Sequence, residues 1–203
     1  MISNTNLFQI GSFNFKLHHF AVIGILLLSF SISYTIKSQP LEYGTELHEF
    51  DPFFNFRATE YIVENGFSEY FQWVDDKSWY VSPKITDKWG IENVGASGRD
   101  VSATSQTMLH ITASITYQIF GGNSNLYDFV ILFPVIIISL TVLVIFALVR
   151  LFAGTTAGLI SSLLFAVSLP IAIRGMAGWF KSEPLGLFYG LLGLYLFLSG
   201  IKS

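Results

Sequence analysis

Long apolar segments free of charge constrain this chain most, because a helix in lipid hydrogen-bonds its backbone internally and leaves only apolar side chains to the membrane. One such segment lies between Lys16 and Lys37, and three more follow in the second half of the chain. Each is about 18–23 residues long, which is the length that a helix needs to cross the hydrocarbon core. We therefore predict an all-α polytopic membrane protein with about four spans. The predicted spans cover residues 18–36, 129–149, 155–173 and 185–201.

The composition supports this class and excludes others. Only 12% of the residues are charged, whereas soluble domains carry about 25%. A formal charge of −3 without a basic run argues against nucleic acid as a partner. The chain has no cysteine, so it has neither a disulfide nor a thiolate metal site. The lack of cysteine favours a prokaryotic, archaeal-type cell membrane over the endoplasmic reticulum.

Residues 101–120 are the ambiguous element of the sequence. Apolar residues recur there at helical spacing, but serine, threonine and glutamine interrupt them too often for a membrane span. We interpret the segment as an amphipathic helix that lies on the membrane surface or packs on other helices.

Four spans then give a consistent orientation. Lys16, Arg150 and Lys202 all fall on one face, which is the positive-inside pattern of membrane proteins. The same arrangement places a large first outer loop, residues 37–128, and a short second outer loop, residues 174–184, together on the opposite face. Two loops on one face can share a site.

A helix is predicted at residues 52–65 of the first outer loop. Asp51 is a residue type that caps helix N-termini, and Pro52 suits the first helical position. Asn65-Gly66 is a typical helix stop. From these residues alone, Asp51 has either a capping role or a chemical one, and the two are compatible because a carboxylate has two oxygens.

The stretch around Asp51 resembles the first extracytoplasmic loop of the catalytic subunit of oligosaccharyltransferase. The resemblance rests on HEFDPFFNFRATEY at residues 48–61, then on Asn65-Gly66, then on WVDDKSWY at residues 73–80. It implies a transmembrane bundle of the C-type glycosyltransferase kind. It also implies that Asp51 is a catalytic residue and a metal ligand.

Residues 174–183, RGMAGWFKSE, resemble the second loop of the same family, which carries an arginine and then an acid-x-acid motif. Glu183 matches the second acid and Arg174 matches the arginine, so the resemblance makes Glu183 a second catalytic and metal-binding residue. Lys181 stands where the first acid is expected. Its charge would repel a metal ion by about 1 kcal/mol per unit charge pair at about 4 Å even in water. Arg174 and Lys181 are therefore candidates for supporting the site or binding a lipid phosphate.

Simpler roles remain open for two of these residues. Glu183 can stabilise the positive end of a helix that starts near Pro184. Lys181 can be an interfacial anchor that extends its ammonium to the headgroups.

The expected cofactor is Mn²⁺ or Mg²⁺, because hard divalent cations prefer oxygen ligands and can neutralise a phosphate leaving group. Asp51 and Glu183 alone are too few to enclose such an ion, so further ligands must come from elsewhere. Asp75, Asp76 and Glu49 are other candidate acids, although an acidic pair in a polar loop is usually just solvated.

The resemblance implies transfer of an oligosaccharide from a polyprenyl phosphate or diphosphate to asparagine in Asn-x-Ser/Thr. The partners would be the membrane, the lipid-linked oligosaccharide and the acceptor polypeptide. The family's C-terminal acceptor-recognition domain, marked by Trp-Trp-Asp-Tyr-Gly, does not occur in these residues. We therefore expect an N-terminal fragment that is inactive without the missing C-terminal portion.

Two other functions stay open. One is another polyprenyl-phosphate-sugar-dependent glycosyltransferase of the same fold. The other is a degenerate, non-catalytic paralogue that binds lipid-linked glycan or partner subunits.

Overall fold

The computed structural model describes residues 6–10, 13–78 and 98–202. They form two compact units, which are described separately: a membrane unit of residues 1–48 and 131–203, and a loop unit of residues 49–130. Trp79 and Tyr80, which belong to the resemblance, and most of the polar loop after them lie outside the described residues.

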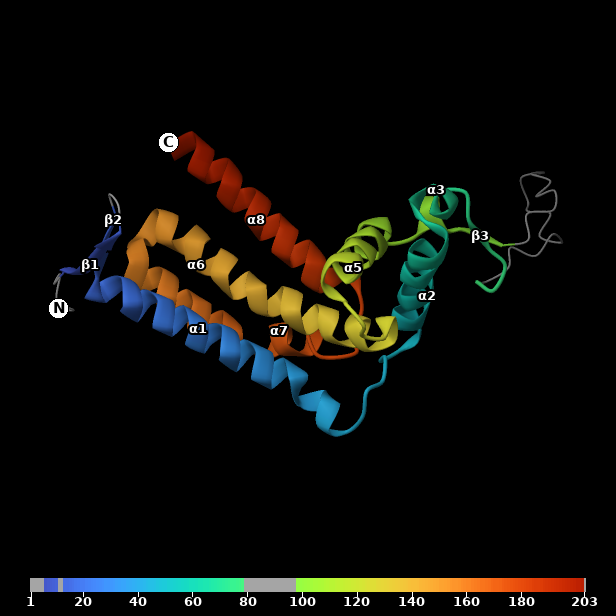
Figure 1. Ribbon diagram of the computed structural model, residues 1–203, viewed down its shortest axis with the longest axis horizontal. Coiled ribbons are helices and arrows are strands. Elements are labelled where there is room, and N and C mark those ends of the chain that lie inside the picture. Colours follow the sequence, from blue (N-terminus) through green and yellow to red (C-terminus); the bar gives the residue numbers. More distant parts are fainter. Residues whose placement is uncertain (1–5, 11–12, 79–97, 203) are drawn as a thin grey trace, which may run out of the picture. The chain divides into compact units, whose positions relative to one another are not determined.

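The membrane unit consists of long helices preceded by a short antiparallel hairpin (Figure 1). Within the described residues, three helical segments are long and apolar enough to cross a membrane: Leu17–Glu42, Leu126–Val167 and Ser182–Lys202. The elements of this unit are β1 (Asn6–Ile10), β2 (Phe13–Lys16), α1 (Leu17–Ser38), the 3-10 helix η1 (Gln39–Glu42), α6 (Leu126–Val167), α7 (Leu169–Arg174) and α8 (Ser182–Lys202).

Helix α6 is a hairpin of two arms that meet at Gly154. Gly154 has φ 84° and ψ 176°, a backbone conformation that glycine adopts readily. Beyond it, the Cα of Gly158 lies so close to Phe146 that an added Cβ would be 2.9 Å from the Phe146 carbonyl oxygen. Twelve residues of straight helix would separate these positions by about 18 Å, so the chain must fold back. The first arm corresponds to the predicted span 129–149. The second arm ends at Val167, so the predicted span 155–173 is broken at Ser168, and its last residues form α7.

A buried polar seam joins α1 to both arms of this hairpin. Ser29, Ser33 and Lys37 are four residues apart, so they share one face of α1, and all three are fully buried. The hydroxyl of Ser139, in the first arm, donates to Ser33 Oγ over 3.1 Å. The hydroxyls of Ser29 and Ser162, in the second arm, lie 3.5 Å apart. Polar contacts of this kind hold helices together where the surroundings offer no water.

Lys37 was predicted to flank the first span, and its side chain is buried. Its ammonium donates to Ser33 Oγ at 3.0 Å and to the Ala166 carbonyl at 3.1 Å. These two acceptors offset part of the cost of removing a charged group from water. Lys37 lies in the last turn of α1, so it flanks the predicted span 18–36 as expected, but its burial was not predicted.

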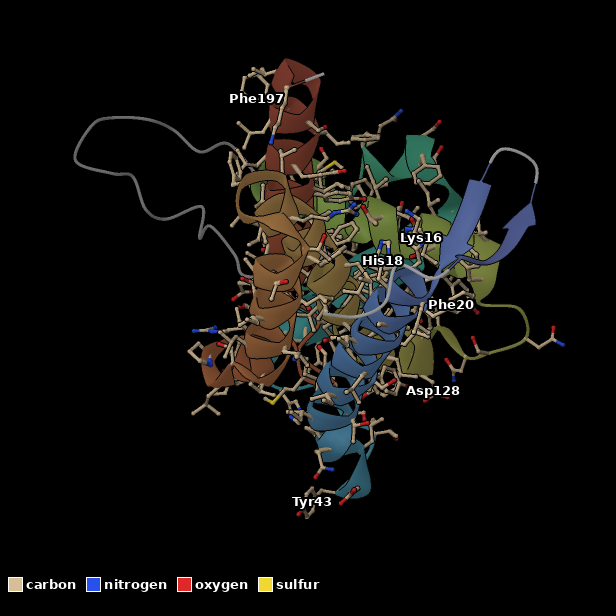
Figure 2. The ribbon with its side chains drawn as sticks, turned by 90° about the vertical axis from the view of Figure 1, so that its left-hand side faces the viewer. Lys16, His18, Phe20, Tyr43, Asp128 and Phe197 are labelled. Carbon is tan, nitrogen blue, oxygen red and sulfur yellow. The ribbon has the colours of Figure 1, made fainter. Side chains whose placement is uncertain are left out.

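The outer helices of this unit expose apolar side chains. Phe20 on α1 and Phe197 on α8 point away from the helix axes, and α1 runs from Lys16 and His18 at one end toward Tyr43 at the other (Figure 2). In the most apolar 18-residue stretch of α1, and likewise of α8, only 11% of the residues are buried within the structure. The corresponding share for α6 is 67%. The exposed apolar surface on α1 and α8 is what lipid contact requires.

The loop unit is built on two packed helices. Its elements are α2 (Phe50–Asn65), α3 (Phe67–Tyr70), β3 (Val74–Asp75), β4 (Arg99–Asp100), α4 (Val101–Thr104) and α5 (Thr107–Phe120). The predicted helix 52–65 thus corresponds to α2. The buried cluster of this unit consists of Ala58, Ile62, Tyr70 and Val101.

The segment 101–120 was predicted as one helix, but it is broken at Ser105. The side chain of Asp100 caps α4 by accepting from the Ala103 amide, and Ser105 is extended, with φ −123° and ψ −173°. Helix α5 then has 14 residues and a length of about 21 Å, which is short of the ~30 Å core of a bilayer. Its buried face combines Leu109 and Ala113 with the polar His110 and Ser114, whereas Met108 and Ile119 are exposed, so apolar side chains lie on both faces and the predicted amphipathic pattern is not clear. It packs on α2, which is one of the two predicted positions for it.

A histidine holds the loop unit together from inside. His110, fully buried on α5, contacts two side chains from other elements. Its Nε2 lies 3.0 Å from Asn55 Oδ1 on α2, and its Nδ1 lies 2.7 Å from the Tyr70 hydroxyl on α3. Since the amide nitrogen of Asn55 donates to Gln106, its Oδ1 must accept from Nε2–H, and Nδ1 accepts from Tyr70. Burial, with a smaller contribution from nearby Arg99, lowers the pKa of His110 to about 3.

This histidine makes the loop unit sensitive to acid. The unfolded chain binds a proton at His110 below about pH 6.5, whereas the folded chain does not until the pH approaches the lowered pKa. Stability is therefore complete above about pH 6.5 and falls by about 2 kcal/mol between pH 7 and pH 5. Hydrogen exchange of the α5 amides, corrected for its intrinsic pH dependence, should show this loss of stability. The variant His110→Gln should lose much less stability between pH 7 and pH 5. Equal pH dependence in the two proteins would contradict the assignment.

Candidate functional site

The loop between α7 and α8 is fixed by backbone hydrogen bonds. The Ala177 amide donates to the Lys37 carbonyl at 2.9 Å, and the Gly178 amide donates to the Ile131 carbonyl at 3.0 Å. The Gly178 carbonyl accepts from the His48 amide at 3.1 Å. The second loop predicted from the sequence is thus tied to α1, to α6 and to the segment after η1.

Two charged side chains, Arg174 and Lys181, contact the ring of Trp179. Its indole is 6% exposed, and the Lys181 ammonium lies 4.5 Å from the ring centroid. The Arg174 guanidinium carbon lies 5.0 Å from the same ring, so both cations make cation–π contacts. Arg174 also pairs with Glu183, with Nη1 and Oε1 separated by 3.3 Å.

Three of the four predicted site residues therefore meet around one tryptophan. Arg174, Lys181 and Glu183 are brought together in the membrane unit, whereas Asp51 belongs to the loop unit. A site shared by Asp51 and Glu183 stays a prediction. Trp179 was not among the predicted site residues, although an aromatic at this position is part of the resemblance.

The position of Lys181 argues against a snorkelling anchor. Only 9% of Lys181 is exposed, and its ammonium lies on the Trp179 ring. A lysine that extended to lipid headgroups would expose its charged end. Lys181 instead holds a fixed positive charge inside the loop, at the position where the resemblance predicts an acid.

The residues of this cluster do not fit a divalent cation by themselves. They offer one carboxylate, Glu183, which already pairs with Arg174, and Lys181 adds a second positive charge. Among all described residues, no group of three or more histidine, aspartate or glutamate side chains is arranged to hold a metal. A metal site would need ligands beyond this loop.

Asp51 lies in the first turn of α2 and does not cap it. The helix begins at Phe50, one residue earlier than the predicted cap, and Glu49 precedes it with φ 69°. The capping role predicted for Asp51 is therefore wrong. Its carboxylate is exposed and lies near the positive end of the helix dipole, which stabilises its negative charge.

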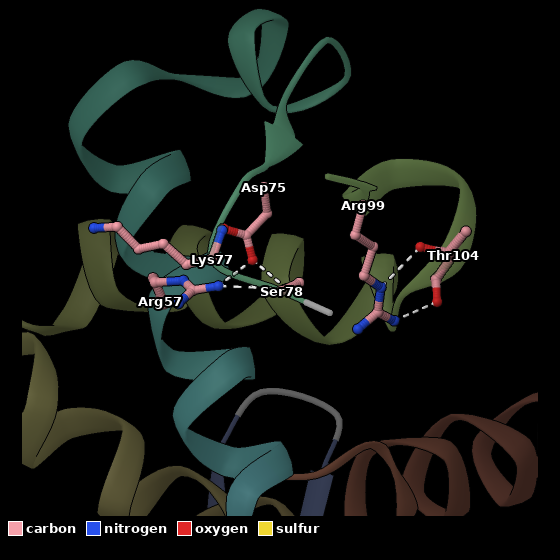
Figure 3. Close-up of polar contacts among 6 residues, drawn as sticks. All are labelled: Arg57, Asp75, Lys77, Ser78, Arg99 and Thr104. Atoms are coloured by element: carbon pink, nitrogen blue, oxygen red, sulfur yellow. Dashed lines mark hydrogen bonds and ion pairs between the residues drawn. The ribbon is translucent and has the colours of Figure 1, made fainter. Parts of the chain in front are cut away.

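Asp75 was expected to be solvated, but it is 1% exposed and paired. Its Oδ2 accepts from Arg57 Nη2 and from the Ser78 hydroxyl, and its Oδ1 accepts from the Lys77 amide at 3.1 Å (Figure 3). Asp75 thereby fixes the segment that follows Trp73 onto α2. Nothing in the local sequence distinguishes it from Asp76, which is exposed.

A cavity of about 400 Å³ lies beside the Arg57–Asp75 pair in the loop unit. The side chains of Arg57 and Arg99 reach it from α2 and β4. Its lining residues are Phe50, Asp51, Phe53, Phe54, Arg57, Lys77, Ser78 and Arg99. The predicted metal ligand Asp51 is therefore part of the wall of a cationic and aromatic cavity.

The sequence matches the family described as "Oligosaccharyl transferase STT3, N-terminal" over residues 15–203. The dolichyl-diphosphooligosaccharide–protein glycosyltransferase subunit STT3B of Oryza sativa subsp. japonica is 28% identical over 185 residues, covering 89% of this chain and 24% of that protein. The subunit STT3B of Arabidopsis thaliana is 29% identical over 166 residues, covering 80% of this chain and 20% of that protein.

The fold is similar to that of a solved archaeal structure. The oligosaccharyltransferase AglB from Archaeoglobus fulgidus, in complex with an inhibitory peptide and a dolichol-phosphate, superposes with a TM-score of 0.68 at 19% identity. The match covers 90% of this chain and 20% of AglB. The chain thus spans a quarter or less of the length of the relatives named here.

Gly178 should be the most sensitive glycine of the second loop. It has φ 80°, and an added Cβ would lie 2.2 Å from the Glu46 carbonyl oxygen. Gly178→Ala should destabilise the membrane unit by more than about 2 kcal/mol, because strain and a backbone clash add. Gly186→Ala is the matched control, since nothing lies within 4 Å of its added Cβ. Thermal unfolding in micelles should show a lower midpoint for Gly178→Ala alone, and equal midpoints for both variants would contradict this.

Proposed function

The chain belongs to the oligosaccharyl transferase STT3 family, and from this we propose that it forms the N-terminal membrane part of a protein N-glycosylation enzyme. That enzyme transfers an oligosaccharide from a polyprenyl phosphate or diphosphate to asparagine in Asn-x-Ser/Thr. The observation that carries the proposal is the family match, which spans both outer-loop motifs and all four candidate site residues. The relatives' description as glycosyltransferase subunits supports the reaction class.

We propose that Asp51 and Glu183 are the catalytic carboxylates and contribute ligands to Mn²⁺ or Mg²⁺. When bound, such an ion neutralises charge on the phosphate leaving group. Asp51 offers an exposed carboxylate, and Arg174 orients the carboxylate of Glu183 through their ion pair. Lys181 contributes an ammonium group to the same loop, which suits it to a phosphate of the lipid carrier.

The proposed topology places residues 37–128 and 174–184 on the outer face of the membrane. Helix α5 is too short to cross, which supports this arrangement. The chain is an integral membrane protein by its family and its apolar helices. We place it in a prokaryotic, archaeal-type cell membrane, a choice supported by the lack of cysteine.

The acceptor polypeptide and the lipid-linked oligosaccharide are the proposed partners. Acceptor recognition would require the portion that the relatives carry beyond the region matched here, since this chain covers 20–24% of their lengths. Transfer is therefore proposed for the complete protein.

One observation favours a second candidate function. Lys181 occupies the expected position of an acid, and its ammonium lies on the buried Trp179 ring. A non-catalytic paralogue that binds lipid-linked glycan would tolerate this replacement.

Asp51→Asn separates these two functions. The change keeps the size of the side chain but removes the negative charge that a hard cation requires. In a chimera that joins this chain to the remaining portion of AglB, with a lipid-linked oligosaccharide and an Asn-x-Ser/Thr peptide, transfer should fall by more than about 100-fold. Asp76→Asn, which removes an exposed acid of the same loop, is the matched control and should transfer normally. Normal transfer by Asp51→Asn would refute its catalytic role, and no transfer by the unaltered chimera would favour the paralogue.

A further inference from the structure

The membrane unit carries its acids and three of its cations at opposite ends. Its acids lie where α1 ends and α8 begins: two follow α1, and the third is Glu183 in the first turn of α8. Lys16 precedes α1, Arg150 lies near the elbow of α6, and Lys202 ends α8, all at the other end of this unit (Figure 1). No acid of the membrane unit is therefore in a position to neutralise these three cations.

A cavity of about 300 Å³ lies at this cationic end, between the elbow of α6 and the last turns of α8. Its lining residues are Phe146, Ala147, Arg150, Leu151, Tyr195 and Lys202. The α6 residues recur at spacings of three and four, and the two α8 residues are two turns apart, so each helix turns one face to the cavity. The described lining thus contains two cations and no acid.

Both cations keep hydrogen-bond donors for a ligand. The Lys202 ammonium donates to the Leu151 carbonyl at 2.6 Å, which lacks a partner along the helix because the first arm of α6 ends before Gly154. An ammonium has three N–H groups, so two remain. The Arg150 guanidinium carbon lies 5.8 Å from the Phe146 ring centroid, and among the described residues no acid pairs with Arg150 or Lys202. An anion between these cations would be stabilised.

The surface around the cavity is apolar and suits a lipid. Phe152, beside the elbow, is 68% exposed, and Phe197 on α8 is 65% exposed. Acyl chains could cover these rings while an anionic head group reached the cations. Tyr195 is a residue type that membrane proteins favour at the interface, and its hydroxyl can donate to a phosphate oxygen. A soluble anion would make no use of the apolar surface.

We propose that this cavity binds the head group of an anionic phospholipid, with Arg150 and Lys202 contacting the phosphate oxygens and Tyr195 donating a hydrogen bond. In the proposed topology this end faces the cytoplasm, so the lipid belongs to the inner leaflet, where anionic head groups bind basic pockets between helices. The bound lipid bridges α6 and α8. The inference does not depend on glycan transfer, because Lys202 lies about 28 Å from Glu183 along α8.

Native mass spectrometry of the chain in detergent micelles tests the site, with phosphatidylglycerol and phosphatidylcholine of the same acyl chains as probes. Phosphatidylglycerol should bind more tightly, because choline cancels the negative charge of the other lipid. Arg150→Gln should weaken phosphatidylglycerol about tenfold, since charge-assisted hydrogen bonds are lost. Equal affinities for the two lipids, or an Arg150→Gln variant that binds phosphatidylglycerol like the unaltered chain, would overturn the proposal.

Lys16→Gln is the matched control. It removes the same charge from the same end of the membrane unit, but Lys16 does not line the cavity. Its effect on phosphatidylglycerol should be small, because salt screens charges that do not contact the ligand. A loss as large as that of Arg150→Gln would show general attraction to the cationic end and reject a defined site.

A milder variant tests the same site without a change of charge. Tyr195→Phe removes only a hydroxyl and should weaken phosphatidylglycerol about fivefold, whereas Tyr189→Phe on the same helix, outside the cavity lining, should not. Equal affinities for these two variants would reject the head-group position between α6 and α8.

A competition experiment identifies the source of the phosphate. Glycerol 3-phosphate carries the phosphate without acyl chains, so it should not displace phosphatidylglycerol when both are present at equal concentration. Displacement under these conditions would assign the cavity to a soluble phosphate and overturn the lipid assignment.

Discussion

The packing of the membrane unit is constrained by the buried ammonium of Lys37. Its ammonium donates to Ser33 and to the Ala166 carbonyl at the end of the α6 hairpin. Its own carbonyl accepts from Ala177 in the loop that carries Trp179 and Glu183. A buried ammonium without acceptors would be strongly destabilising, so α1, α6 and the loop must come together for it to be tolerated. The position of Glu183 is therefore coupled to helix packing inside the membrane.

The loop unit shows the same principle with different groups. The ring nitrogens of His110 find hydrogen-bond partners only when α2 and α3 supply Asn55 and Tyr70. The buried carboxylate of Asp75 finds its cation only when Arg57 reaches it from α2. Both polar groups are buried, so each arrangement is specific. The cavity beside Asp51 has its cationic wall because Asp75 and Thr104 hold the two arginines.

Periodicity and length predicted the helices well, because these signals are local. Helix α2 was predicted from Pro52 and the Asn65-Gly66 stop, and the arms of α6 were predicted from the length of the apolar segments. The break at Ser105 and the burial of Lys37 were missed, since both depend on partners distant in the chain. Asp75 and Asp76 are adjacent acids, yet only Asp75 meets an arginine. Of the candidate site, the resemblance identified Arg174, Lys181 and Glu183. Only the fold showed that Trp179 contacts the two cations and that Arg174 pairs with Glu183.

The central claim is that Asp51 and Glu183 act at one site. Because the chain has no cysteine, the pair Asp51→Cys and Glu183→Cys can be joined by a short thiol-reactive cross-linker in membranes and detected by mass spectrometry. Efficient intramolecular cross-linking of this pair is the expected result. No cross-link is expected for Asp51→Cys with Lys202→Cys, because Lys202 lies about 28 Å from Glu183 along α8. Absence of a cross-link between Asp51→Cys and Glu183→Cys would contradict the shared site.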